Sequence, residues 1–248
     1  MVDNPSLFRD GYVLPAEGYR VFETGAYANR VPLVIGTNAD EVKLFQFFDR
    51  SLDWRGKEYA AAARFGSDRW KADGVDAVAR RLSVQPGQPP VYAYHFRWGS
   101  LRDDGTSVLP GPWGRRLGSF HSLEIPFFLG TDTVDWVLQV LLFSRKNAPG
   151  RRALSDVMMR FIARFIRTGD PNGDGLPSWP AWSNDDGGPK SLVLDADFDK
   201  PVVAVSVIEY TREQAEAALR TAVGDEVAAA IAGRRGAVGS DFASEAVP

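Results

Sequence analysis

His121 is one of only two histidines in the 248 residues, and its surroundings suit proton transfer. It follows small and polar residues and precedes the apolar run 125–129, which predicts a loop at the start of a helix. An imidazole exchanges protons near neutral pH, which few other side chains do. His121 is therefore a candidate general base, and the alternative is a hydrogen-bonded structural histidine.

Two adjacent carboxylates, Asp40 and Glu41, follow the apolar run 31–37. The run reads as a buried parallel strand, and catalytic groups of α/β sheets gather beyond the carboxyl ends of such strands. A carboxylate that accepts a hydrogen bond from Nδ1–H of His121 would fix its tautomer and stabilise the imidazolium. The residues alone leave open which of the two acids does this.

A triad of this kind also needs a nucleophile. The expected residue is a serine in a Gly-x-Ser-x-Gly elbow at a strand–turn–helix junction. No such elbow occurs in the 248 residues. The chain thus carries candidates for the base and the acid, and the nucleophile has to come from elsewhere.

The two stretches resemble a known family. Residues 121–130 (His-x-x-Glu-Ile-Pro-Phe-x-x-Gly) resemble the histidine loop of type-B carboxylesterases, which include the cholinesterases, and residues 36–41 (Gly-Thr-Asn-x-Asp-Glu) resemble the loop that supplies their acid. The chain is similar to the bacterial para-nitrobenzyl esterases of this family. The resemblance runs from about residue 10 to about residue 207 and covers only the C-terminal half of the family's length.

The resemblance implies an α/β fold: the C-terminal portion of an α/β-hydrolase, with a mostly parallel central sheet flanked by helices. It implies that residues 1–248 form the C-terminal part of one domain, which is incomplete without its N-terminal half. It also implies that Glu41 is the triad acid. Val42 departs from the family pattern, which usually has Gly after the acid.

The implied function is carboxylic ester hydrolysis by a Ser-His-Glu triad through an acyl-enzyme. His121 and Glu41 belong to this chain, whereas the serine and the oxyanion hole precede the acid loop in the family. A separate chain or a cleaved N-terminal segment is expected to supply them through a large, obligate, apolar interface, so the chain alone is not expected to be stable and soluble. The alternatives are a catalytically silent binding protein of this fold and an inactive fragment.

Composition and short motifs bear on other kinds of function and site. A net charge of −3 gives no electrostatic case for nucleic acid binding, and the absence of cysteine excludes disulfides and thiolate chemistry. No apolar run reaches the ~18–20 residues that span a bilayer. Residues 170–181 open like a calcium-binding loop, but Pro171 and Ala181 break the pattern and predict a turn. No cofactor or metal is expected, and the compartment is left open between cytoplasmic and secreted, because any signal peptide would lie on the N-terminal half.

Hydrophobic periodicity predicts the elements that position these residues. Strands are expected at 31–37, 91–98, 191–194 and 202–207, and helices at 58–65, 70–82, 136–143, 151–167 and from 211 onward. The last of these helices is expected to start with a capping box formed by residues 211–214 (Thr-Arg-Glu-Gln). Gly66 and Ser67 are expected to break the helical region 43–82, and 99–117 to form an exposed loop. The apolar stripe of 151–167 predicts a core helix. Residues 234–248 are expected to be a mobile tail.

Other side chains near the two stretches are candidates for supporting roles. Glu124 lies three residues after His121, so it either helps to hold the site, as the resemblance implies, or favours the start of a helix by its charge. His95 is expected to pack within its strand. Some of five phenylalanines are expected to line an apolar pocket: Phe45, Phe47, Phe48, Phe127 and Phe128.

Overall fold

The computed structural model describes residues 9–49, 53–131 and 136–233. The predicted mobile tail, 234–248, lies outside the described residues. The described helices are α1 (Val21–Thr24), α2 (Lys43–Gln46), α3 (Lys57–Lys71), α4 (Ala77–Ser83), α5 (Trp113–Arg116), α6 (Ile125–Leu129), α7 (Trp136–Leu142), α8 (Ala148–Thr168), α9 (Arg212–Val223) and α10 (Asp225–Ala232), with a 3₁₀ turn η1 (Gly18–Arg20) and a π-helical segment η2 (Ala72–Asp76). None of them is both long and apolar enough to cross a membrane.

A four-stranded sheet forms the centre of the described chain. Its strands are β1 (Leu33–Asn38), β2 (Val91–Phe96), β3 (Ser191–Ala196) and β4 (Pro201–Ser206), in this spatial order. The pairs β1–β2 and β2–β3 are parallel, and β3–β4 is antiparallel. The predicted α/β fold with a mostly parallel sheet is confirmed.

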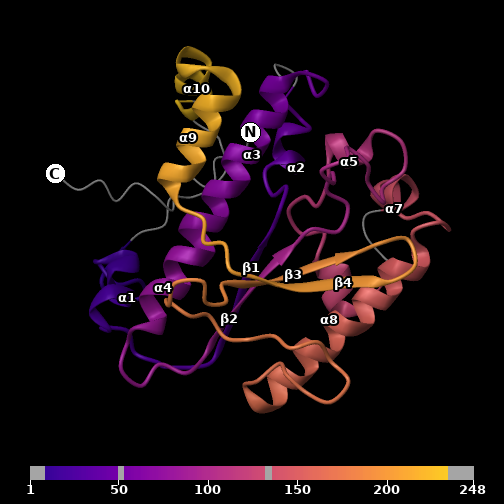
Figure 1. Ribbon diagram of the computed structural model, residues 1–248. Helices are drawn as coiled ribbons and strands as arrows, with labels where there is room; N and C mark the ends of the chain where they lie inside the picture. The colour runs from indigo at the N-terminus through magenta and orange to yellow at the C-terminus, as the bar shows by residue number, and fades with distance from the viewer. Residues whose placement is uncertain (1–8, 50–52, 132–135, 234–248) are drawn as a thin grey trace.

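Helices cover both faces of this sheet. Helix α8 packs against β3 and β4 on one side, and Figure 1 shows α3 on the other, with α9 beside it. The alternation of side chains along β2 follows this arrangement. Tyr92 and Phe96 join the buried cluster that includes α8, whereas Val91 and Ala93 join the cluster of α4. The sheet is therefore the middle layer of three.

Strand β1 is less buried than its sequence predicts. Among the described residues it is an outer strand, paired with β2 alone, and residues 33–36 are half-buried. Only its last two residues, Thr37 and Asn38, are buried. Their burial places the carboxyl end of β1, which leads to the two acids, inside the protein.

The predicted helix break at Gly66 and Ser67 is wrong. Helix α3 runs through both residues, and the irregular turn comes later, in η2. A Cβ atom at Gly66 would lie 2.9 Å from Cγ1 of Val42. The backbone N–H of Val42 also donates to Oγ of Ser67, at 3.4 Å. Because Gly66 has no side chain, α3 packs closely against Val42, the residue that follows Glu41 and stands where the resembled family usually has glycine.

The segment 99–117 is not the exposed loop that its composition predicts. It contains the short helix α5, and Val108, Leu109 and Leu117 are buried in the main core. Helix α8 follows its prediction more closely. Leu154, Met158 and Phe161 are fully buried, although Ile166, in the last turn, is 76% exposed.

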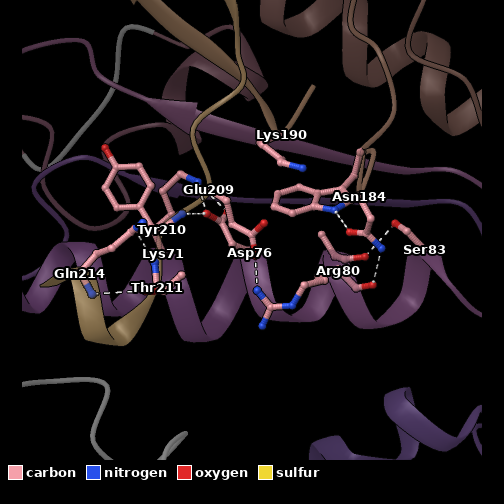
Figure 2. A network of polar contacts seen from close by, with 12 residues as sticks. Lys71, Asp76, Arg80, Ser83, Asn184, Lys190, Glu209, Tyr210, Thr211 and Gln214 are labelled. Carbon is pink, nitrogen blue, oxygen red and sulfur yellow. Dashed lines mark hydrogen bonds and ion pairs between the residues drawn. The ribbon is translucent and has the colours of Figure 1, made fainter. Parts of the chain in front are cut away.

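A buried ion pair ties α3 to α9 (Figure 2). Nζ of Lys71 lies 2.6 and 2.7 Å from the two carboxylate oxygens of Asp76, and neither residue is more than 1% exposed. The backbone N–H of Tyr210, just before α9, donates to the same carboxylate at 2.7 Å. Thr211 then starts α9 with the predicted capping box, completed by Gln214. Asp76 thus connects η2 to the entry of the C-terminal helices.

Removing this carboxylate should strongly destabilise the fold. Asp76→Ala leaves the ammonium of Lys71 buried and unpaired, which costs about 3–5 kcal/mol of unfolding free energy. Urea unfolding followed by circular dichroism measures the loss. The matched control is Glu209→Gln, because Arg80, the partner of Glu209, is 45% exposed at its side chain. This control should cost less than about 1 kcal/mol, and equal losses in both variants would contradict the prediction.

Candidate active site

Glu41 lies in the turn that follows β1, and its carboxylate folds back onto the end of that strand. Its Oε1 accepts hydrogen bonds from the hydroxyl of Thr37 at 2.9 Å and from the backbone N–H of Asn38 at 2.7 Å. The residue is only 4% exposed. Two donors therefore hold one carboxylate oxygen, and the other is left to face a different segment.

That segment carries His121. Nδ1 of His121 lies 2.7 Å from Oε2 of Glu41, and its backbone N–H donates to the carbonyl oxygen of Glu41 at 3.3 Å. The His121 side chain is 39% exposed, against 5% for the side chain of Glu41. Because Glu41 engages Nδ1, Nε2 is the nitrogen that can exchange a proton with a reacting group.

The pKa of His121 is raised above its ordinary value. The hydrogen bond to Glu41 is the main cause, burial opposes it, and the charges of Glu41 and Glu124 add to it. The protonated imidazole is thus stabilised by a fixed anion, which a general base requires at the moment when it accepts a proton.

Asn38 and Glu124 brace the histidine loop against β1. The side-chain amide of Asn38 donates to the carbonyl oxygen of Phe120, at 2.7 Å, and to Oε2 of Glu124. Glu124 is the N-cap residue of α6, and burial raises the pKa of its carboxyl group. Of the two roles left open for Glu124, its side chain shows the contact with a residue that holds the site, and it makes no capping hydrogen bond to α6.

Ser122, directly after the histidine, adopts a strained backbone conformation. Its φ of 73° is the one positive value of a non-glycine residue among the described ranges. Such conformations cluster where the surrounding structure fixes a functional side chain. The surrounding structure thus holds the loop at His121 against the energetic cost of the strained Ser122 backbone. No sequence pattern had indicated this strain.

Asp40, the second acid, points away from the imidazole. Its carboxylate pairs with Lys43 at 2.8 Å and accepts hydrogen bonds from the hydroxyl of Ser100 at 2.6 Å and the backbone N–H of Ser119 at 3.1 Å. Of the two adjacent carboxylates, the structure brings only Glu41 to His121.

Two aromatic rings flank the imidazole. The ring of Phe45, from α2, lies 5.5 Å from the His121 ring between centroids, and the ring of Trp70, from α3, lies 5.3 Å away. Phe45 was among the phenylalanines expected at the pocket. Trp70 was not, because a tryptophan in a distant helix carries no sequence signal of this contact.

The other phenylalanines divide between core and surface. Phe127 is 2% exposed and packs against Phe96 and Trp98, so it cannot line an open pocket. Phe48 is 73% exposed. Phe128 packs edge-on against Tyr94, with centroids 5.3 Å apart.

His95 and the calcium-like stretch stand outside this constellation. The ring of His95 packs edge-on against Tyr210, with centroids 5.9 Å apart, and desolvation lowers its pKa to about 3. Oδ1 of Asp170 accepts hydrogen bonds from the backbone and side-chain N–H groups of Asn172, which closes a turn. In the described part of the chain, no group of three or more acidic, histidine or cysteine residues could hold a metal ion.

Comparison with known proteins shows which family this chain resembles. A sequence profile described as "Carboxylesterase family" matches residues 53–200, which include His121. Carboxylesterase 5A of Canis lupus familiaris is 60% identical over 96 residues, which are 38% of this chain and 15% of that protein. Carboxylesterase 4A of Bos taurus is 37% identical over 107 residues, 43% of this chain and 16% of that protein.

A solved structure shows the same relation in three dimensions. The carboxylesterase EST55 of Geobacillus stearothermophilus, at pH 6.2, aligns with a TM-score of 0.54 and 25% identity over 85% of this chain and 44% of that chain. The chain thus spans less than half of this structure and about a sixth of the curated relatives. Because the profile matches more than half of its residues, the chain belongs to the carboxylesterase family, with the α/β-hydrolase fold that its two loops had predicted.

Proposed function

We propose that this chain contributes the histidine and the acid of a Ser-His-Glu triad to a carboxylic ester hydrolase. The observation that carries the proposal is the 2.7 Å contact between Nδ1 of His121 and Oε2 of Glu41. A buried, doubly hydrogen-bonded carboxylate behind a half-exposed imidazole is the arrangement that a general base of this kind needs.

The reaction proceeds in two halves. Nε2 of His121 takes the proton of a serine hydroxyl while the serine oxygen attacks the ester carbonyl, and it returns this proton to the departing alkoxide. In the second half, water attacks the acyl-enzyme, His121 takes its proton, and the serine leaves with that proton as the acid is released. Glu41 stays ionised throughout, holding Nδ1–H and stabilising the imidazolium.

The nucleophilic serine and the oxyanion hole come, in this proposal, from the N-terminal half of the same enzyme, on a separate chain or a cleaved segment. The absence of a Gly-x-Ser-x-Gly elbow from the 248 residues supports this assignment. Apolar exposure on α6, the helix that follows His121 in the chain, also supports it: Ile125 and Leu129 are 46% and 71% exposed. A complementary segment would cover these side chains through an apolar interface and complete residues 1–248 as one domain.

Covalent labelling tests where the nucleophile lies. The purified protein, with every polypeptide that accompanies this chain, is treated with a fluorophosphonate and analysed by intact mass. We expect the adduct on a serine outside these 248 residues, because the chain has no elbow. An adduct on this chain would contradict the split triad, and no adduct in a sample that holds the complementing segment would favour a silent binding protein.

Substitution of the two proposed catalytic residues should abolish most of the turnover. His121→Gln removes the base, and Glu41→Gln removes the anion that orients it, so each should lower kcat for a nitrophenyl ester on the order of 10⁴-fold. His95→Gln and Glu209→Gln are matched controls, since neither contacts the pair. A loss below about tenfold for His121→Gln, in a folded protein, would exclude His121 as the base.

The pH dependence of kcat/KM should report the raised pKa of His121. Only the neutral imidazole accepts a proton, so kcat/KM should fall as the pH drops through this pKa, above the ordinary histidine value. Glu41→Gln removes the main cause of the increase and should move the midpoint to lower pH. Measurement from about pH 5 to about pH 9 covers the fall and the plateau. A midpoint that does not move in Glu41→Gln would show that Glu41 does not set the pKa of the titrating group.

A further inference from the structure

We infer that Asp40 is a positioning residue, which fastens the acid loop and the histidine loop to each other and so sets the contact between Glu41 and His121. The inference rests on the proposed function for its catalytic meaning. It concerns the cluster of Asp40, Lys43, Ser100 and Ser119, named here the Asp40 cluster.

Asp40 and Ser119 pair in both directions. The backbone N–H of Asp40 donates to the carbonyl oxygen of Ser119 at 3.2 Å, and the backbone N–H of Ser119 donates to Oδ2 of Asp40 at 3.1 Å. Asp40 directly precedes Glu41, and Ser119 lies two residues before His121. A closed pair of bonds at this place therefore fixes the register of the two loops next to both proposed catalytic residues.

The same carboxylate gathers two further segments. The hydroxyl of Ser100, from the loop after β2, donates to Oδ2 at 2.6 Å and lies 2.8 Å from the hydroxyl of Ser119. Oδ1 pairs with Lys43 at 2.8 Å, at the start of α2. The side chains of Asp40 and Lys43 are only 16% and 8% exposed, so little water competes for these contacts.

Gly118 shows how closely the histidine loop approaches this carboxylate. Its φ is +54°, and a Cβ atom there would lie 2.0 Å from Oδ2 of Asp40. A side chain at this position would therefore collide with the carboxylate and strain the backbone as well. The absence of a side chain at Gly118 leaves room for the Asp40 carboxylate. This close contact is what a residue that positions the loop requires.

The effect of Asp40 on the imidazole is geometric. The charges that raise the pKa of His121 belong to Glu41 and Glu124, and Asp40 directs its own charge to Lys43. If the Asp40 cluster loosens, the hydrogen bond between Glu41 and His121 lengthens, and the main cause of the raised pKa weakens. The pKa of His121 is thus a readout of positioning that a merely stabilising residue would not move.

The test compares Asp40→Asn with the uncharged change Ser100→Ala. The asparagine keeps an oxygen acceptor but turns an N–H group toward either Lys43 or Ser119, so it breaks one side of the cluster. Ser100→Ala removes one donor to Asp40 without altering the charge. Asp197→Asn is the matched control, because this carboxylate pairs with Arg102, at 2.7 Å, in the turn between β3 and β4.

The pKa of His121 is measured by NMR in the ¹³C-histidine-labelled protein as purified, and the signal is assigned by its loss in His121→Asn. We expect Asp40→Asn to lower this pKa toward the ordinary value and to reduce kcat by about 10- to 100-fold with a smaller change in KM. Ser100→Ala should act in the same direction with a smaller effect, and Asp197→Asn should change neither quantity.

Glu41→Gln separates the two possible failures. If Glu41→Gln lowers the pKa of His121 while folded Asp40→Asn and Ser100→Ala leave it unchanged, the positioning role of Asp40 is wrong and the proposed function stands. If Glu41→Gln itself leaves that pKa unchanged, the histidine–acid pair fails, and the proposed function fails with it. Should Asp40→Asn not fold, Ser100→Ala alone decides.

Discussion

The site depends on one constraint: the carboxylate of Glu41 is buried, and a buried charge must be fully hydrogen-bonded. The end of β1 supplies two of its donors, from Thr37 and Asn38, and the histidine loop supplies the third. If one of these groups moves, the buried anion loses a hydrogen bond that water does not replace. Burial makes a charged Glu41 energetically costly unless it is hydrogen-bonded. The same burial therefore makes its contact with His121 specific.

The surrounding packing places this carboxylate. Parallel pairing with β2 fixes the carboxyl end of β1, and the match of Val42 with Gly66 holds the acid turn against α3. Helix α3 also carries Trp70, whose ring lies beside His121, and ends one residue later at Lys71. The buried pair of Lys71 and Asp76 therefore anchors the same end of the helix that contacts the site, and it links the C-terminal helix α9 to it.

Much of this arrangement could be predicted from the sequence, because its signals are local. Alternation and apolar runs located the four strands, and the stripe of α8 and the capping box at Thr211 located two helices. The pairing of His121 with Glu41 followed from a resemblance and matches the observed contact. The predictions that were wrong concern residues whose structure depends on tertiary partners. Gly66 reads as a helix break in the sequence, but in the fold it packs against Val42. Segment 99–117 reads as exposed, but its leucines are buried in the core.

Exposure divides the site into an inner and an outer part. The acid is nearly inaccessible, whereas the imidazole that it orients remains 39% exposed. Among the described residues, Glu41 and the donors that hold it fix the Nδ1 side of the proposed base. In the proposed reaction, proton transfer takes place at Nε2, and the geometry there depends on the surface that packs against the imidazole. In the proposed enzyme, an error in that packing would misalign the nucleophile and leave the histidine–acid pair intact, so formation of the pair and catalytic competence are physically separable.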